Sequence, residues 1–160
     1  MYPEDGRQTE VSAFMTGRCV DISEVADPTF AQHMIGDGIA IKPSDGHLYA
    51  PVDGEVVALF PTGHAIGLRT AGGLEILLHI GLDTVELKGR PFDIRVAKGQ
   101  KVKRGDLLVT ADLEMIRQSH KDTITSLVVT KPATARITKT SLDADVDPTQ
   151  IVMLVDDRTD

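Results

Sequence analysis

Short apolar, β-prone runs alternate with Gly- or Pro-containing breaks over most of the chain. We expect these runs to form strands at residues 11–21, 38–42, 46–50, 54–60, 64–70, 74–79, 93–96, 100–102, 107–112, 125–129, 135–138 and 151–155. Helical signals are weak, and they predict only short helices at residues 27–35 and 112–121, the second with Asp112 as N-cap. This pattern predicts an all-β fold, an antiparallel β-sandwich or barrel with one or two short helices. Strands and helices do not alternate regularly, which argues against a doubly wound nucleotide-binding sheet.

Two similar turns, at residues 50–56 and 96–106, resemble those of the barrel-sandwich hybrid found in biotinyl and lipoyl carrier domains. In such carriers the modified lysine sits at a hairpin tip within a Met-Lys or Asp-Lys pair. The chain contains neither dipeptide. A swinging-arm carrier is therefore disfavoured, while the architectural likeness stands.

Two of the predicted strands form a hairpin whose outer ends carry His64 and His79, joined through Ala71-Gly72-Gly73. If the loop is Ala71-Gly72, the two histidines face each other, with Cβ atoms about 4.5–5.5 Å apart. A Gly72-Gly73 loop makes them diagonal neighbours on the same face. A three-residue loop would place them on opposite faces, so the predicted pair depends on a loop of even length.

The composition narrows the class of protein. With 160 residues, of which 41% are hydrophobic, the chain is large enough to bury a core, and we expect a flexible tail at residues 1–10 and a single domain at residues 11–160. The formal net charge of −7 argues against nucleic acid as the main partner and favours a protein that presents a basic patch.

Cellular location follows from cysteine content and hydropathy. Cys19 is the single cysteine, so no intrachain disulfide forms, and a reducing compartment is expected. No apolar run approaches the roughly 20 residues that span a bilayer, and the first five residues do not begin a signal peptide. We expect a cytoplasmic protein without direct membrane insertion.

Several segments in order resemble one family. They are Asp27-Pro28-Thr29-Phe30-Ala31 and residues 36–43, 50–54, 62–65 and 79–89. Together they resemble the glucose-type enzyme IIA (EIIA) domain of the bacterial phosphoenolpyruvate-dependent sugar phosphotransferase system. The resemblance extends from about Thr16 to Val155 and implies the β-sandwich called the duplicated hybrid motif.

This resemblance implies a phosphohistidine relay. His79 would accept a phosphoryl group from the histidine of the phosphocarrier protein HPr and pass it to a cysteine of an enzyme IIB domain, within an enzyme IIB/IIC sugar permease. A neutral imidazole suits this role because it is nucleophilic and, once phosphorylated, a good leaving group. His64 would donate a hydrogen bond to a phosphoryl oxygen.

The family pattern also implies roles for residues near the pair. Thr62 would orient His64, and the backbone carbonyl of Gly81 would fix the tautomer of His79. Asp27 and Asp83 resemble an acidic pair that meets arginines on partner proteins.

The apolar docking surface of the family corresponds here to Phe30, Met34, Ile35, Phe60, Leu77 and Val85. The chain departs from the family at Leu77, where an aromatic residue is common, and at Pro61, where a polar residue is usual. Each feature also has a structural alternative: the two aspartates as solvated surface charges, and the six apolar residues as plain core.

Two further functions use the same histidine face. A zinc site would need a third protein ligand besides the two imidazoles, and the His-x-His ligand pair of zinc endopeptidases with a similar fold is missing. The third ligand would be Asp83 or another histidine, or, as the resemblance suggests, a residue of a partner protein. We treat any metal here as incidental and expect no cofactor. A chiefly regulatory protein would use its phosphorylation state to control binding to permeases or metabolic enzymes. The pattern does not identify the sugar, and the lack of a long Ala/Pro/Gln linker favours a free-standing protein.

Overall fold

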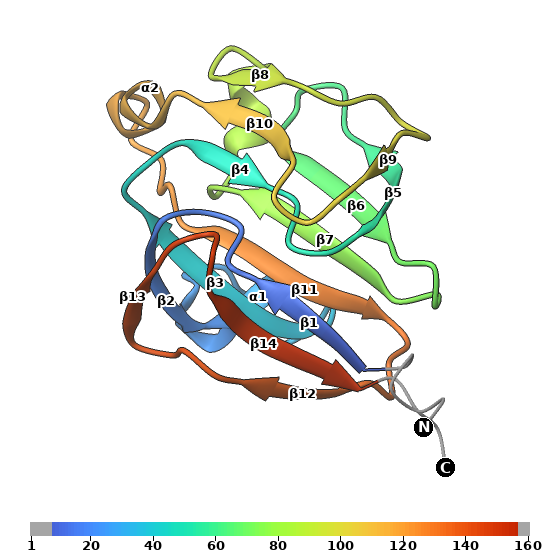
Figure 1. The fold of residues 1–160 in the computed structure, drawn as a ribbon. Coiled ribbons are helices and arrows are strands. Elements are labelled where there is room, and N and C mark those ends of the chain that lie inside the picture. The colour runs from blue at the N-terminus through green and yellow to red at the C-terminus, as the bar shows by residue number, and fades with distance from the viewer. Residues whose placement is uncertain (1–7, 157–160) are drawn as a thin grey trace.

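The computed structural model describes residues 8–156, and this part of the chain is mostly strands (Figure 1). The strands are β1 (Gln8–Ser12), β2 (Gly17–Asp21), β3 (Asp37–Pro43), β4 (His47–Tyr49), β5 (Gly54–Leu59), β6 (Ala65–Arg69), β7 (Glu75–Ile80), β8 (Phe92–Ile94), β9 (Lys101–Val102), β10 (Leu107–Ala111), β11 (Thr125–Lys131), β12 (Arg136–Lys139), β13 (Ala144–Val146) and β14 (Ile151–Asp156). The helices are α1 (Pro28–Ala31) and α2 (Leu113–Gln118), with 3₁₀ turns η2 (Ile22–Glu24) and η3 (Thr84–Leu87).

The strands form three antiparallel sheets. The largest has the order β13-β2-β3-β11-β7-β6-β5-β9, and the smaller sheets have the orders β1-β14-β12 and β4-β10-β8. Figure 1 shows the two small sheets on one side of the large sheet. The predicted all-β sandwich is thereby confirmed. The longest helix within residues 8–156 is α2, with six residues, and none of the helices there could span a bilayer.

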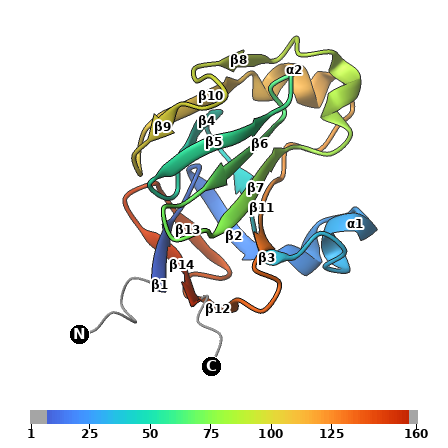
Figure 2. The same ribbon diagram turned by 90° about the vertical axis from the view of Figure 1, so that its right-hand side faces the viewer.

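Alternating side chains of the large sheet enter two separate cores. Ile39, Leu78 and Leu127 are fully buried in the main core between the sheets. Their neighbours Ala40 and Val128 belong to a smaller cluster on the opposite face, which η2 and α1 cover. Strand side chains alternate between faces, so His79, next to Leu78, lies on the same face as this smaller cluster. Figure 2 shows α1 projecting on that side of the large sheet.

Several element boundaries differ from the prediction. The expected strand at residues 11–21 is two strands in different sheets, because the chain crosses between them and buries Phe14 and Met15 completely in the main core. Gln8–Ser12 pairs with β14, so residues 8–10 of the expected tail are part of a sheet, while residues 1–7 lie outside the described part.

The helices are shorter than predicted, and one strand was missed. Helix α1 ends after a single turn, and His33, two residues later, has the left-handed φ of 59° that helices do not continue through. Asp112 is the N-cap of α2 as predicted, since its side chain accepts from Met115 N at 3.1 Å. Strand β13 was not anticipated because it has only three residues.

Candidate functional site

The hairpin that carries the two histidines has an odd-length loop. Ala65, not His64, pairs with His79, and Thr70 N donates to Leu74 O at 2.9 Å, which leaves three residues in the loop. The predicted two-residue loop is therefore wrong, and with it the argument that placed both histidines on one face. The rings nevertheless meet, with centroids 5.1 Å apart and planes at 80°.

The position of His64 explains this contact. His64 precedes the first residue of β6 and follows Gly63, which has a φ of +81°. Strand alternation therefore does not determine the direction of its side chain. The carbonyl of His64 still accepts from Ile80 N at 2.7 Å, which holds the turn against the end of β7.

His79 lies near the end of β7, between β6 and the buried Ser126 of β11. Its Nδ1 is 2.9 Å from the carbonyl oxygen of Gly81. A carbonyl only accepts, so Nδ1 carries the hydrogen and, in the neutral ring, Nε2 keeps its lone pair. The predicted contact between Gly81 and His79 is present, and it leaves the lone pair of the neutral ring on Nε2.

The turn after β7 requires glycine at position 81. Gly81 has a φ of +73°, and an added Cβ would lie 2.5 Å from Cγ2 of Thr84 and 2.8 Å from the carbonyl oxygen of Asp122. The Gly81 N–H donates to Ile124 O at 2.9 Å, which anchors the carbonyl that faces His79.

Thr84 is a supporting residue that the sequence analysis missed. Its buried hydroxyl donates to Ile80 O and closes the same turn. The only signal for it was its place within the 79–89 segment of the family pattern, since a threonine hydroxyl in a turn has no distinctive spacing.

His64 is held by Thr62, as the resemblance implied. The Thr62 hydroxyl is hydrogen-bonded to Nδ1 of His64. When the hydroxyl donates, Nε2 of neutral His64 carries the hydrogen and acts as a donor. His64 is only 5% exposed, so its ring is fixed both by this hydrogen bond and by the surrounding packing.

The two imidazoles are neutral near pH 7. Burial, and secondarily the nearby His79, lowers the pKa of His64 from 6.5 to about 4. Burial also lowers the pKa of His79, although the Gly81 carbonyl, Asp27 and Asp83 oppose that shift. A neutral His79 has a free lone pair, which a protonated ring lacks.

Asp27 and Asp83, the predicted acidic pair, both act on His79. Asp27 is half-buried, and its side chain caps α1 by accepting from Thr29 N at 3.0 Å. Asp83 is exposed and precedes η3 with a left-handed φ of 57°. Asp27 therefore has a structural role besides its charge, whereas the side chain of Asp83 makes no capping hydrogen bond.

The predicted docking residues differ in exposure. Met34, Val85 and Phe60 are exposed by 71%, 50% and 43%. Phe30 is buried, and Ile35 and Leu77 are half-buried against the smaller cluster, so these three also serve as core. Two aromatic rings flank the imidazoles: Phe30 is 5.1 Å from His79, and Phe60 is 5.2 Å from His64, between ring centroids.

A metal at this face would need a ligand from elsewhere. Within residues 8–156, no three His, Cys, Asp or Glu side chains are grouped so that they could hold an ion. The site combines instead one oriented nucleophilic nitrogen, one imidazole donor and an apolar, partly acidic surround. Such a set suits reversible transfer of a phosphoryl group, which depends mainly on positioning and charge stabilisation.

Comparison with known proteins agrees with this chemistry. The family model for the phosphoenolpyruvate-dependent sugar phosphotransferase system, EIIA 1, matches residues 9–135. The glucose-specific EIIA component of Halalkalibacterium halodurans is 53% identical over 120 residues, covering 75% of this chain and 69% of the relative. The corresponding component of Bacillus cereus is 48% identical over 132 residues, covering 82% and 80%.

A longer multidomain relative and a relative of known structure belong to the same system. A glucose-specific EIICBA component of Streptococcus pneumoniae is 53% identical over 121 residues, which cover 76% of this chain but only 17% of that protein. The structure of glucose permease IIA from Mycoplasma capricolum superposes with a TM-score of 0.89 at 35% identity, covering 96% of this chain and 99% of that one. The resemblance inferred from the sequence is confirmed, and the chain belongs to the EIIA family of the phosphoenolpyruvate-dependent sugar phosphotransferase system.

Proposed function

We propose that this protein is a cytoplasmic phosphocarrier in which Nε2 of His79 accepts a phosphoryl group from phospho-HPr and passes it to a cysteine of an enzyme IIB domain. The observation that carries the proposal is the hydrogen bond from Nδ1 of His79 to Gly81 O, beside the ring of His64. It leaves one nitrogen of a half-buried, neutral imidazole available for attack.

The proposed transfer conserves atoms and charge without a cofactor. The Nε2 lone pair of His79 forms a bond to phosphorus as the bond to the HPr histidine breaks, and that histidine recovers its own lone pair. In the second step a cysteine thiolate attacks the same phosphorus, and the bond to Nε2 breaks. The Gly81 carbonyl stabilises the phosphorylated ring by accepting from its Nδ1–H.

His64 and the surrounding charges have supporting roles in this proposal. His64 donates from Nε2 to a phosphoryl oxygen, because Thr62 satisfies its Nδ1. The exposed apolar residues Met34, Phe60 and Val85 provide the contact area, and Asp27 and Asp83 pair with arginines of HPr and enzyme IIB. The names of the relatives support glucose as the sugar that the pathway takes up.

The test is phosphorylation by phosphoenolpyruvate with purified enzyme I and HPr. We expect an acid-labile, alkali-stable adduct on the wild type and none on His79→Gln. His64→Gln should be labelled but should pass the group on poorly. His120→Gln, which alters an exposed histidine, serves as the control and should behave like the wild type. Failure to label the wild type, or normal labelling of His79→Gln, would refute the proposal.

A further inference from the structure

The charge of the chain is strongly asymmetric. Residues 88–104 contain seven Lys or Arg and one Asp, a formal charge of +6, whereas the whole chain has −7 and the remainder therefore −13. All seven basic residues of this segment are exposed. This segment is therefore locally basic within an acidic protein, and exposed basic side chains attract anionic partners.

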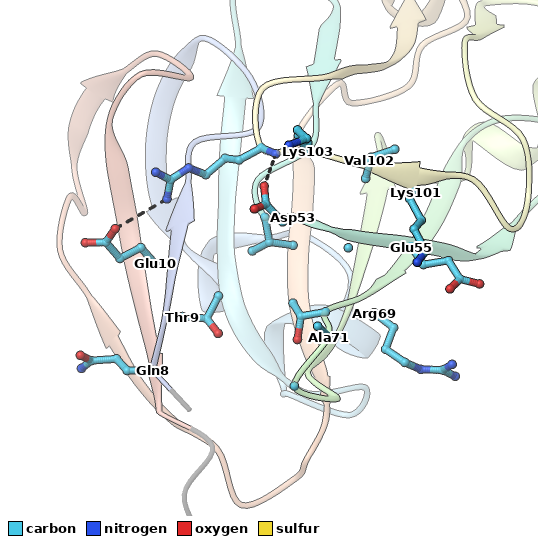
Figure 3. A pocket seen from close by; sticks show the side chains of 15 residues that line it. Gln8, Thr9, Glu10, Asp53, Glu55, Arg69, Ala71, Lys101, Val102 and Lys103 are labelled. Atoms are coloured by element: carbon cyan, nitrogen blue, oxygen red, sulfur yellow. Dashed lines mark hydrogen bonds and ion pairs between the residues drawn. The ribbon is translucent and has the colours of Figure 1, made fainter. Parts of the chain in front are cut away.

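Part of this basic surface lines a groove of about 1180 Å³ (Figure 3). The groove is bordered by β1, by the segment leading into β5, by the β6–β7 loop and by β9. Its basic side chains are Arg69, Lys101, Lys103 and Arg104. Three carboxylates, those of Glu10, Asp53 and Glu55, also line it.

Two of the four cations are unpaired. Arg104 is 3.7 Å from Glu10 and donates its backbone N–H to Asp53 at 2.8 Å, and Arg69 is 3.1 Å from Glu75. By contrast, Lys101 and Lys103 have no ion-pair partner in the described part of the chain and are exposed. Among residues 8–156, the groove therefore has two ammonium groups that no carboxylate neutralises.

The groove also contains a free sheet edge. Within the described residues, strand β1 is the end strand of its sheet and pairs with β14 alone. Ser12 N donates to Pro51 O at 3.0 Å, so the edge opposite β14 faces residues 51–54. Figure 3 shows the Thr9 side chain on the same side of β1 as Ala71 of the β6–β7 loop, whereas Gln8 and Glu10 point to the other side, where Glu10 pairs with Arg104. The Ser12 N–H of this edge is already bonded to Pro51 O, so an extended peptide would add a strand along residues 8–11.

We propose that this groove is a second docking site, which takes an extended acidic segment of a partner polypeptide as an added strand on β1. The carboxylates of the partner segment pair with Lys101 and Lys103. The groove and the histidine pair lie at opposite ends of the β6–β7 hairpin, because Arg69 ends β6 and His64 precedes it. Five residues of strand separate them by about 17 Å, so both sites are available at once.

Other anionic partners fit the groove less well. None of the residues from 8 to 156 that line it is aromatic, so the described lining offers no ring on which the bases of a single-stranded nucleic acid would stack. A flat anionic membrane would contact Glu10, Asp53 and Glu55 together with the lysines, and the like charges would repel. An extended peptide avoids this repulsion because residues two apart share a face, so its acidic side chains can all be placed on the side of the lysines.

The probe for this site is a fluorescent peptide of alternating Glu and Thr, with binding measured by anisotropy at low and high salt. We expect salt-sensitive binding to the wild type that weakens about tenfold in Lys101→Glu/Lys103→Glu. The matched control Lys42→Glu/Lys131→Glu reverses two exposed lysines outside the groove and should bind like the wild type. A Gln-Thr peptide of equal length should not bind.

Further arms separate the alternatives. Peptides N-methylated at every second residue test strand addition, and at least one of the two methylation phases should abolish binding. The proposal would be overturned if both methylated peptides bound as well as the unmethylated one, or if the Lys101→Glu/Lys103→Glu variant bound the peptide as well as the wild type. It would also be overturned if the protein bound anionic vesicles but not the peptide. His79→Gln should still bind the peptide, and the groove variant should still be phosphorylated, so this proposal and the phosphocarrier proposal fail independently.

Discussion

Nδ1 of His79 lies 2.9 Å from the carbonyl oxygen of Gly81, two residues further along the chain. The hydrogen bond connects the chemistry of the site to the turn that follows β7. Because that turn is held by Gly81 N, Ile124 O and the Thr84 hydroxyl, the tautomer of His79 is determined by backbone geometry.

Replacing Gly81 with alanine should disturb both stability and transfer. The change forces a side chain into a left-handed backbone and against Thr84 and Asp122, which we expect to cost about 2–4 kcal/mol and to slow phosphorylation of His79. Gly99→Ala is the control, since Gly99 has a φ of +90° but no atom within 4 Å of the added Cβ, so it should cost only about 1 kcal/mol. Urea denaturation measures the stability of both variants. Equal losses of stability would contradict the inference that the turn at Gly81 has no room for a side chain.

Removing the Thr62 hydroxyl should affect transfer more than folding. Thr62→Val keeps the shape of the side chain but leaves Nδ1 of His64 without its partner. Because one hydrogen bond is lost, we expect transfer of the phosphoryl group from His79 to enzyme IIB to be about 3- to 10-fold slower. Thr138→Val, on the exposed part of β12, should leave the rate unchanged. A rate for Thr62→Val equal to that of the wild type would show that the contact does not position His64.

The buried histidine makes the native state sensitive to acid. The pKa of His64 falls from 6.5 to about 4 on folding, so between these values the unfolded state binds more protons. Stability should therefore decrease as the pH is lowered from 6.5 to 4, by roughly 3 kcal/mol at most from this residue. Urea denaturation across this range should show a smaller decrease for His64→Gln. An NMR titration that finds His64 protonated at pH 6 would contradict this.

A lysine and two aspartates near the end of β12 form a stabilising cluster. Lys139 Nζ is 2.5 Å from Asp21 and 2.7 Å from Asp37, and the lysine side chain is 14% exposed. Burial raises the pKa of Asp21, but hydrogen bonds from Lys139 and Ser23 outweigh this effect and hold it at about 2.

Lys139→Met leaves these two carboxylates close together without a cation. We expect a loss of about 1–3 kcal/mol at pH 7, below the range for fully buried pairs because Asp37 is 42% exposed. The loss should shrink as the pH falls from 3.8 towards 2, where Asp21 becomes protonated. Denaturation of the variant beside Lys42→Met, an exposed lysine, measures the effect. A loss that did not depend on pH would exclude the ion pairs as its cause.

The all-β class could be predicted because apolar alternation is a local property of each strand. Leu78 and Leu127, for example, are apolar residues at the alternating positions that a buried strand face requires. The start of α2 could also be predicted from local sequence, because the single side chain of Asp112 caps the helix. The hairpin register could not be predicted, because Ala71-Gly72-Gly73 permits loops of two or three residues with opposite consequences for the facing side chains.

The expectations for the residues around the histidine pair came from the resemblance more than from the pattern. The roles of Thr62 and Gly81 were transferred from the family, and nothing in their local spacing indicated contacts with the two histidines. The groove was missed for a different reason. Its cations and its free edge come from segments as distant as Glu10 and Lys101, and the net charge of −7 conceals the basic region that contributes to it.

The most direct test of the account is ¹⁵N–³¹P correlation NMR of the protein phosphorylated by enzyme I and HPr. We expect coupling of phosphorus to Nε2 of His79, with Nδ1 of the same ring still protonated and donating to Gly81 O. Phosphorus bound to Nδ1 of His79, or to His64, would contradict the central claim that the Gly81 carbonyl selects the nitrogen that carries the phosphoryl group.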